Sequence, residues 1–158
     1  LLFQAGLFDE TFRMWDDVEL CLRLRKLGIK QIWNGNARGY HYKPPFQRLD
    51  IERWKKKFAL MGWDAYRYTW KHPRLDTRIA SGYWFGNLLF HQLRKFLLAP
   101  LLSDRGSAAA LRTFERLRLN LPLALLVNLI GKNAYMEGLL LAVRKMDGKL
   151  PSDLPQLT

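Results

Sequence analysis

The sequence has almost no cysteine, and it has no internal repeat or low-complexity tract. The single cysteine, Cys21, excludes an internal disulfide framework and fits a reducing compartment such as the cytoplasm. Its leucine neighbours favour a buried, inert thiol over a nucleophile. The chain opens with Leu1-Leu2-Phe3-Gln4, without an initiator Met or a basic leader, so we expect a piece of a longer protein and see no targeting segment.

Long apolar runs are also missing. The run from residue 88 to 102 is interrupted by His91, Arg94 and Lys95, and the run from residue 121 to 130 is short. Neither reaches the roughly 20 apolar residues that a helix needs to cross a bilayer. Both segments could pack in a helical core or lie in a membrane interface, where aromatic and basic side chains often occur together.

Acidic residues are scarce: 14 Asp and Glu face 26 Lys and Arg, which gives a net charge of +12. The excess is +2 in residues 1–50 and +10 in residues 51–158. Such a field attracts nucleic acid, anionic membranes or phosphorylated ligands, or it is only a solvated basic face. Aromatic and basic residues alternate between Arg53 and Arg78, which leaves open a nucleic-acid-binding helical module. A non-catalytic peripheral membrane domain is the other alternative.

The first fifty residues mix helical and strand patterns. The spacing predicts a helix over residues 16–27, with Asp16 and Glu19 as a capping box, an i,i+4 pair of Glu19 with Arg23, and Gly28 at the end. Residues 29–33 and 38–42 read as short strands around the turn Asn34-Gly35-Asn36, and Pro44-Pro45 marks a boundary.

The rest of the chain has only helical patterns. Predicted helices cover residues 49–61, 64–70, 77–98, 107–119 and 133–146, and a loose Pro-rich tail follows.

Two adjacent carboxylates, Asp16 and Asp17, stand at the predicted start of the first of these helices. A carboxylate there is favoured as an anion by the helix dipole and is held on a fixed backbone. Such a group could take a proton from a sugar hydroxyl as that hydroxyl attacks an anomeric carbon. The helix start alone would also explain Asp16, but it explains Asp17 less well.

The segment from Gly6-Leu-Phe-Asp-Glu through Asp16-Asp17, Leu20, Arg23 and Gly28 to His41 resembles the second half of a family-2 glycosyltransferase domain. That family carries a "GGFDE…EDxxLxxRxxxxG…H" pattern, in which Ala5 here replaces the first Gly and Asp16 replaces Glu. A weaker echo, Ala134 to Arg144, looks like the tail helix of bacterial rhamnosyltransferase-like enzymes of cell-envelope polysaccharide synthesis.

The resemblance implies an α/β fold: the end of a truncated GT-A (Rossmann-like) catalytic domain over residues 1–45, a helical extension over 46–150 and a flexible tail over 151–158. It also implies an inverting, metal-dependent transferase that moves a sugar from a nucleotide sugar to a glycan or lipid-linked acceptor. The expected place is the cytoplasm or the inner face of the membrane, with an anionic membrane surface and no nucleic acid as partner.

The resemblance also assigns residues. Asp17 is the expected general base with Asp16 beside it, and His41 the expected contact to the metal or the diphosphate. Substrate-binding roles fall on Trp15, Glu19, Arg23 and Lys43, of which Glu19 and Arg23 could equally order the base. The Asp-x-Asp pair that the family uses for Mg²⁺ or Mn²⁺ is absent from the 158 residues. We therefore expect metal binding and transfer only together with a donor-binding half.

Overall fold

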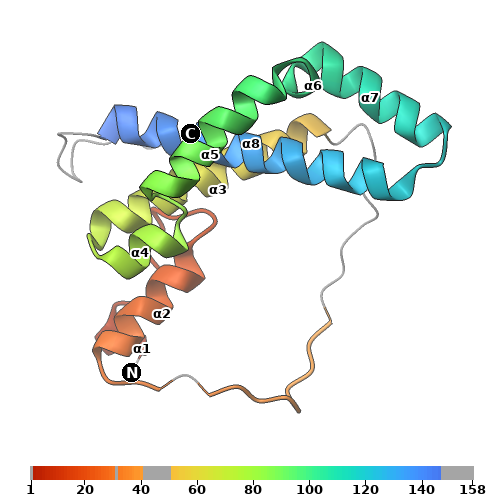
Figure 1. Cartoon of the computed structure of the whole chain (residues 1–158). Helices are drawn as coiled ribbons and strands as arrows, with labels where there is room; N and C mark the ends of the chain where they lie inside the picture. Colours follow the sequence, from red (N-terminus) through yellow and green to blue (C-terminus); the bar gives the residue numbers. More distant parts are fainter. Residues whose placement is uncertain (1, 31, 41–50, 147–158) are drawn as a thin grey trace.

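The protein is all-helical in the part of the chain that its computed structural model describes, which is residues 2–30, 32–40 and 51–146. Eight helices follow one another: α1 (Leu2–Ala5), α2 (Asp16–Lys26), α3 (Ile51–Lys71), α4 (Leu75–Ala80), α5 (Phe85–Leu97), α6 (Ala99–Leu102), α7 (Asp104–Arg116) and α8 (Asn120–Met146). Figure 1 shows α3 and α8 side by side, α5 to α7 arching over them, and α1 and α2 together at the N-terminal end.

The α/β expectation of a truncated GT-A domain is therefore wrong, since these residues contain no strand. The turn at Asn34 forms, because its side chain accepts the Asn36 N–H at 3.0 Å and its carbonyl the Ala37 N–H at 3.2 Å. The described residues that flank this turn do not pair, and Ile32 and Trp33 project into solvent. A two-stranded hairpin that buries neither face is at best marginal, and no sheet in the described residues supports this one.

The core lies between α3 and α8, which run in the same direction. Trp63 and Tyr66 of α3 pack against Leu139, Ala142 and Met146 of α8. A second small cluster joins Phe12, Leu22 and Tyr68, and thereby attaches the N-terminal segment to the end of α3. A third, around Leu111, Leu126 and Ile130, holds α7 against α8.

Glycines let α3 and α8 approach closely. A Cβ on Gly62 would lie 1.8 Å from the Tyr135 carbonyl oxygen, and one on Gly138 would lie 2.0 Å from that of Ala59. This contact explains why α3 is one helix instead of the two pieces expected over 49–61 and 64–70. The packing of α8 compensates for the low helix propensity of Gly62. Packing against α3 likewise makes α8 longer than the helix expected over 133–146. It begins at Asn120, and Pro122 is tolerated in its first turn.

The helix expected over residues 77–98 is divided instead. Ser81 ends α4, and Gly82 follows with a φ of +73° that L-residues rarely adopt. The polypeptide then restarts at Phe85 as α5. The tail over 151–158 lies outside the described residues.

Candidate functional site

The predicted carboxylates stand where α2 begins. Helix α2 matches the expected bounds within a residue, and Gly28 follows it with a φ of +78°. The capping box is wrong, however: Trp15 occupies the N-cap position and makes no side-chain cap bond. The Glu19 carboxylate does not bond back to the helix start, because it is bound by Arg23, Lys71 and His72.

Glu19 is the centre of a buried ion-pair cluster. Its side chain is 0% exposed, and its oxygens lie 2.8 Å from Arg23 Nε, 2.8 Å from Lys71 Nζ and 2.9 Å from His72 Nε2. Lys71 also reaches Asp9 at 2.7 Å. We call Asp9, Glu19, Arg23, Lys71 and His72 the Glu19 cluster. It confirms the i,i+4 pair of Glu19 with Arg23 and adds partners from the end of α3.

The proton positions in the cluster follow from its contacts. Burial alone would raise the pKa of Glu19, but the hydrogen bonds from Lys71, His72 and Arg23 outweigh burial and lower it. Burial lowers the pKa of His72 despite its bond to Glu19, which favours the neutral ring. A neutral His72 can donate from Nε2 to Glu19 and accept at Nδ1 from Lys26 Nζ, 3.2 Å away. The cluster is thus a satisfied structural joint between α2 and α3.

The turn around Gly6, which precedes α2 in sequence, is hydrogen-bonded to Arg23 of the Glu19 cluster. The Arg23 guanidinium donates to the carbonyl oxygens of Ala5 and Leu7, on either side of Gly6. Gly6 has a φ of +82°, and Leu7 follows at +49°. The Asp9 carboxylate accepts the Thr11 N–H at 2.9 Å, so the Gly-Leu-Phe-Asp-Glu segment is a closed turn.

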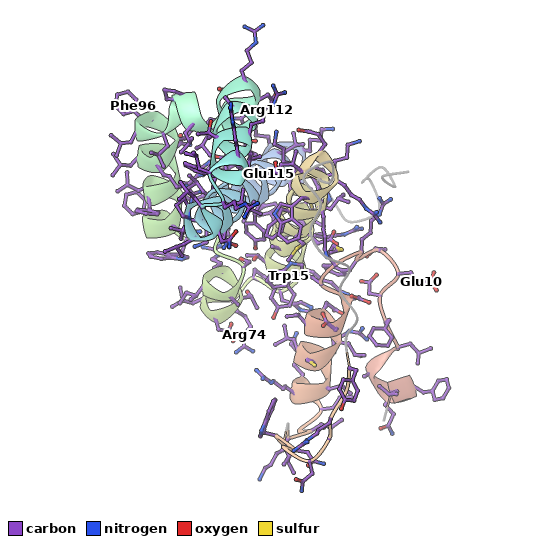
Figure 2. All side chains as sticks on the ribbon, turned by 90° about the vertical axis from the view of Figure 1, so that its right-hand side faces the viewer. Glu10, Trp15, Arg74, Phe96, Arg112 and Glu115 are labelled. Carbon is purple, nitrogen blue, oxygen red and sulfur yellow. The ribbon has the colours of Figure 1, made fainter. Side chains whose placement is uncertain are left out.

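A second anchor fixes the backbone just ahead of α2. The Asp64 carboxylate, 3% exposed, accepts the N–H groups of Arg13 and Met14 at 2.7 and 2.9 Å. Burial raises the pKa of Asp64 and outweighs these two bonds. Trp15 lies next, half-buried where α2 meets α3, with its ring centroid 5.4 Å from that of Tyr68 (Figure 2).

Asp17 differs from the other two carboxylates in the first turn of α2. It is exposed, whereas Asp16 is half-buried and Glu19 is fully buried. Its Oδ1 accepts the Val18 N–H at 2.7 Å, which satisfies one of the free donors of the first helical turn. Within the described residues no ion pair involves Asp17 or Asp16. The fold therefore presents Asp17 to solvent, without an ion pair, on a backbone that is anchored at two points.

The remaining predicted residues lie elsewhere. His41 and Lys43 fall in 41–50, outside the described residues. The residues that are described contain no group of three His, Cys, Asp or Glu side chains able to hold a metal ion. Cys21 is exposed on α2, so the prediction of a buried thiol is wrong: its three leucine neighbours in sequence do not enclose it.

The aromatic residues of α3 bear on the nucleic-acid alternative. Trp63, Tyr66 and Tyr68 are buried, and Trp70 packs against the α3–α8 core. Their rings are therefore not free to stack on bases. None of the helices in the described ranges combines the length and hydropathy needed to span a bilayer.

Sequence reasoning missed Asp64, Lys71 and His72 as parts of this site, and it gave no separate role to Asp9 of the Gly-Leu-Phe-Asp-Glu segment. The partners of Glu19 and of the Arg13–Met14 backbone lie about fifty residues further along the chain, so no local pattern marks them. Comparison with known proteins adds nothing to the geometry: no protein-family model, curated protein or solved structure matches the chain.

Proposed function

We propose that this chain carries the acceptor-side carboxylate of an inverting glycosyltransferase, with Asp17 as general base. The observation that supports it is the exposed, unpaired Asp17 at the start of α2, on a backbone fixed by Asp64 and by the Glu19 cluster. The position agrees with the motif resemblance, although the described residues lack the sheet that the resemblance implies.

The chemistry asked of Asp17 is one proton transfer. Its carboxylate accepts the proton of an acceptor hydroxyl while that oxygen forms a bond to the anomeric carbon of the donor sugar. The bond from that carbon to the nucleoside diphosphate breaks on the opposite face, so the configuration inverts and the diphosphate leaves with the bonding electrons. The acceptor is a glycan or a lipid-linked sugar, and the half-buried Trp15 offers an apolar ring edge beside it.

Glu19 and Arg23 act in this proposal as positioning residues. Glu19 is fully buried and Arg23 closes the turn at Gly6, so both orient α2 rather than contact the acceptor. No metal step is assigned to the described residues, because they offer no cluster of ligands. Donor and metal binding belong to residues outside them, including an Asp-x-Asp pair that the 158 residues lack.

The test uses the complete gene product, assayed with a panel of nucleotide sugars and lipid-linked or glycan acceptors. Asp17→Asn should lower kcat by about 10²–10⁴-fold, the usual contribution of a general base, with little change in KM for the nucleotide sugar. Asp76→Asn is the matched control, since Asp76 is an exposed carboxylate on α4 that accepts the next residue's N–H, as Asp17 does, and is ion-paired with Arg74 at the surface; it should retain activity.

Near-normal turnover by Asp17→Asn would refute the assignment. A complete gene product without an Asp-x-Asp pair, or one that transfers from no nucleotide sugar in the panel, would refute the function itself.

A further inference from the structure

Helix α5 lies at the surface with most of its large apolar side chains exposed and a histidine buried, the reverse of the usual surface helix. Two of its polar side chains face inward, although Gln92 and Lys95 are exposed: His91 is 1% exposed, and Asn87 donates to the Gly82 carbonyl at 2.7 Å and lies 3.4 Å from Met136 Sδ. Arg94 is half-buried and contacts His91 Nδ1 at 3.1 Å. Large apolar side chains face outward instead, and we call them the outer face of α5: Phe85, Leu89, Phe90, Leu93, Phe96 and Leu97.

The outer face is continuous along the helix. With 3.6 residues per turn, its six members share one broad side of α5, opposite His91. Phe85 and Phe96, at the two ends, are 78% and 81% exposed. Figure 2 shows Phe96 on the outer edge of the molecule, pointing away from the other helices. Scattered exposed leucines are ordinary on a protein surface, but a contiguous aromatic and aliphatic face marks an interaction site.

The basic residues near this face and the positive net charge of the chain indicate which kind of partner covers it. Arg94 borders the face, with its guanidinium 5.9 Å from the centroid of the Phe90 ring, and Lys95 lies on the other flank of the helix, beyond Gln92. The Lys95 side chain, 53% exposed, lies 3.1 Å from Glu137. The chain carries a net charge of +12, with +10 in residues 51–158. Two such chains repel each other, which disfavours a second copy as the cover.

We propose that the outer face of α5 inserts into the interfacial region of an anionic lipid membrane, with Arg94 and Lys95 at the level of the headgroups. A 13-residue helix is about 20 Å long, too short to cross a hydrocarbon core of about 30 Å, so it lies in the membrane plane. Apolar side chains enter the acyl boundary while flanking cations meet anionic headgroups. The proposal does not depend on the transferase function, and its test involves no sugar transfer.

The experiment is co-sedimentation of the 158-residue chain with vesicles of phosphatidylcholine alone or mixed with phosphatidylglycerol. We expect binding to the mixed vesicles, weakening as salt rises, and little binding to phosphatidylcholine alone. The double variant Phe85→Ser/Phe96→Ser should reduce binding about tenfold or more. Both side chains are largely exposed already, so the fold should persist, as a circular dichroism spectrum and melting curve can verify.

The matched control is Ile32→Ser/Trp33→Ser. These side chains are 85% and 92% exposed, and the 32–40 segment lies far from α5 (Figure 1), so this variant should bind like the parent. Lys95→Gln should weaken binding to the mixed vesicles only. The proposal is overturned if the parent binds neither vesicle, if the α5 double variant binds as well as the parent, or if both double variants lose binding equally. Self-association abolished by the α5 variant, without vesicle binding, would also overturn it and identify a second copy as the cover.

Discussion

At the scale of single residues, the Glu19 cluster shows how a carboxylate can be buried at low cost. Three side chains donate hydrogen bonds to Glu19, and two of them are charged. These donors are occupied by Glu19 and do not point at an open site for a ligand. Asp9 belongs to the same cluster. Burial alone would raise the pKa of Asp9, but the hydrogen bonds from Lys71 and Thr11 outweigh the effect of burial and lower this pKa to about 2. The cluster keeps the two carboxylates ionised and the imidazole neutral.

That arrangement makes stability depend on pH in two stages. The pKa values of His72 and His91 are lowered, mainly by burial, from the ordinary 6.5, so each stabilises the fold above that value. This contribution is lost as the pH falls below 6.5, because the unfolded chain binds the proton first. Glu19 and Asp9, also lowered, add a second loss below their ordinary values of 4.5 and 3.8.

Urea unfolding measured from pH 7.5 to 5.5 can check the first stage. In His72→Gln one of the two buried rings is removed, and Gln can still donate to Glu19. The slope of the unfolding free energy against pH should fall in this variant by up to about 1.4 kcal/mol per pH unit. An unchanged slope would mean that His72 titrates alike in the folded and unfolded chains.

The same residues show where sequence reasoning stops. The pair of Glu19 with Arg23 and the stop at Gly28 were predictable, because both depend on spacing within one helix. The roles of His72 and Asp64 were not, because their partners are set by how α3 folds back on α2. The motif predicts Asp17 as the base, but only the structure shows that Asp17 is exposed while Glu19, two residues on, is buried.

At the scale of helices, the glycines of α3 and α8 stabilise the pair by close packing, although glycine has a low helix propensity. Periodicity predicted most of α3, in two pieces, but only residues 133–146 of α8, because Gly62 and Gly131 are locally poor helix formers. The join depends on the facing helix. A Cβ on Gly62 would fall within 3 Å of three backbone atoms of α8, which cannot move independently of that helix.

Gly62→Ala should therefore lower the free energy of unfolding by about 1–3 kcal/mol, since overpacking exceeds the gain of about 1 kcal/mol in helix propensity. Gly39→Ala is the control, because a Cβ there meets nothing within 4 Å. Urea titration of both variants gives the comparison. If Gly62→Ala were as stable as the parent, the close approach of α3 and α8 would be in doubt.

At the scale of the whole molecule, tertiary packing is uneven. Fully buried side chains concentrate where the second half of α3 meets the second half of α8, as in Leu139, Ala142 and Met146. By contrast, α1 has only Ala5 buried and α6 has no buried residue. In the described residues the predicted strands are missing for the same reason: residues 32–40 are exposed and pack on no core element, so no packing offsets the entropy lost on ordering a sheet.

This unevenness predicts the order of amide hydrogen exchange in the 158-residue chain. Amides between Trp63 and Thr69 and between Leu139 and Met146 should exchange last, near the free energy of global unfolding, because opening them requires separating α3 from α8. The α5 amides should exchange earlier in solution, since that helix buries only His91. Added vesicles containing phosphatidylglycerol should slow exchange in α5 selectively, leaving the α3–α8 pair unchanged. Equal protection of α5 and α8 without lipid would show that the outer face of α5 is already covered in solution, and it would contradict the uneven packing of the helices.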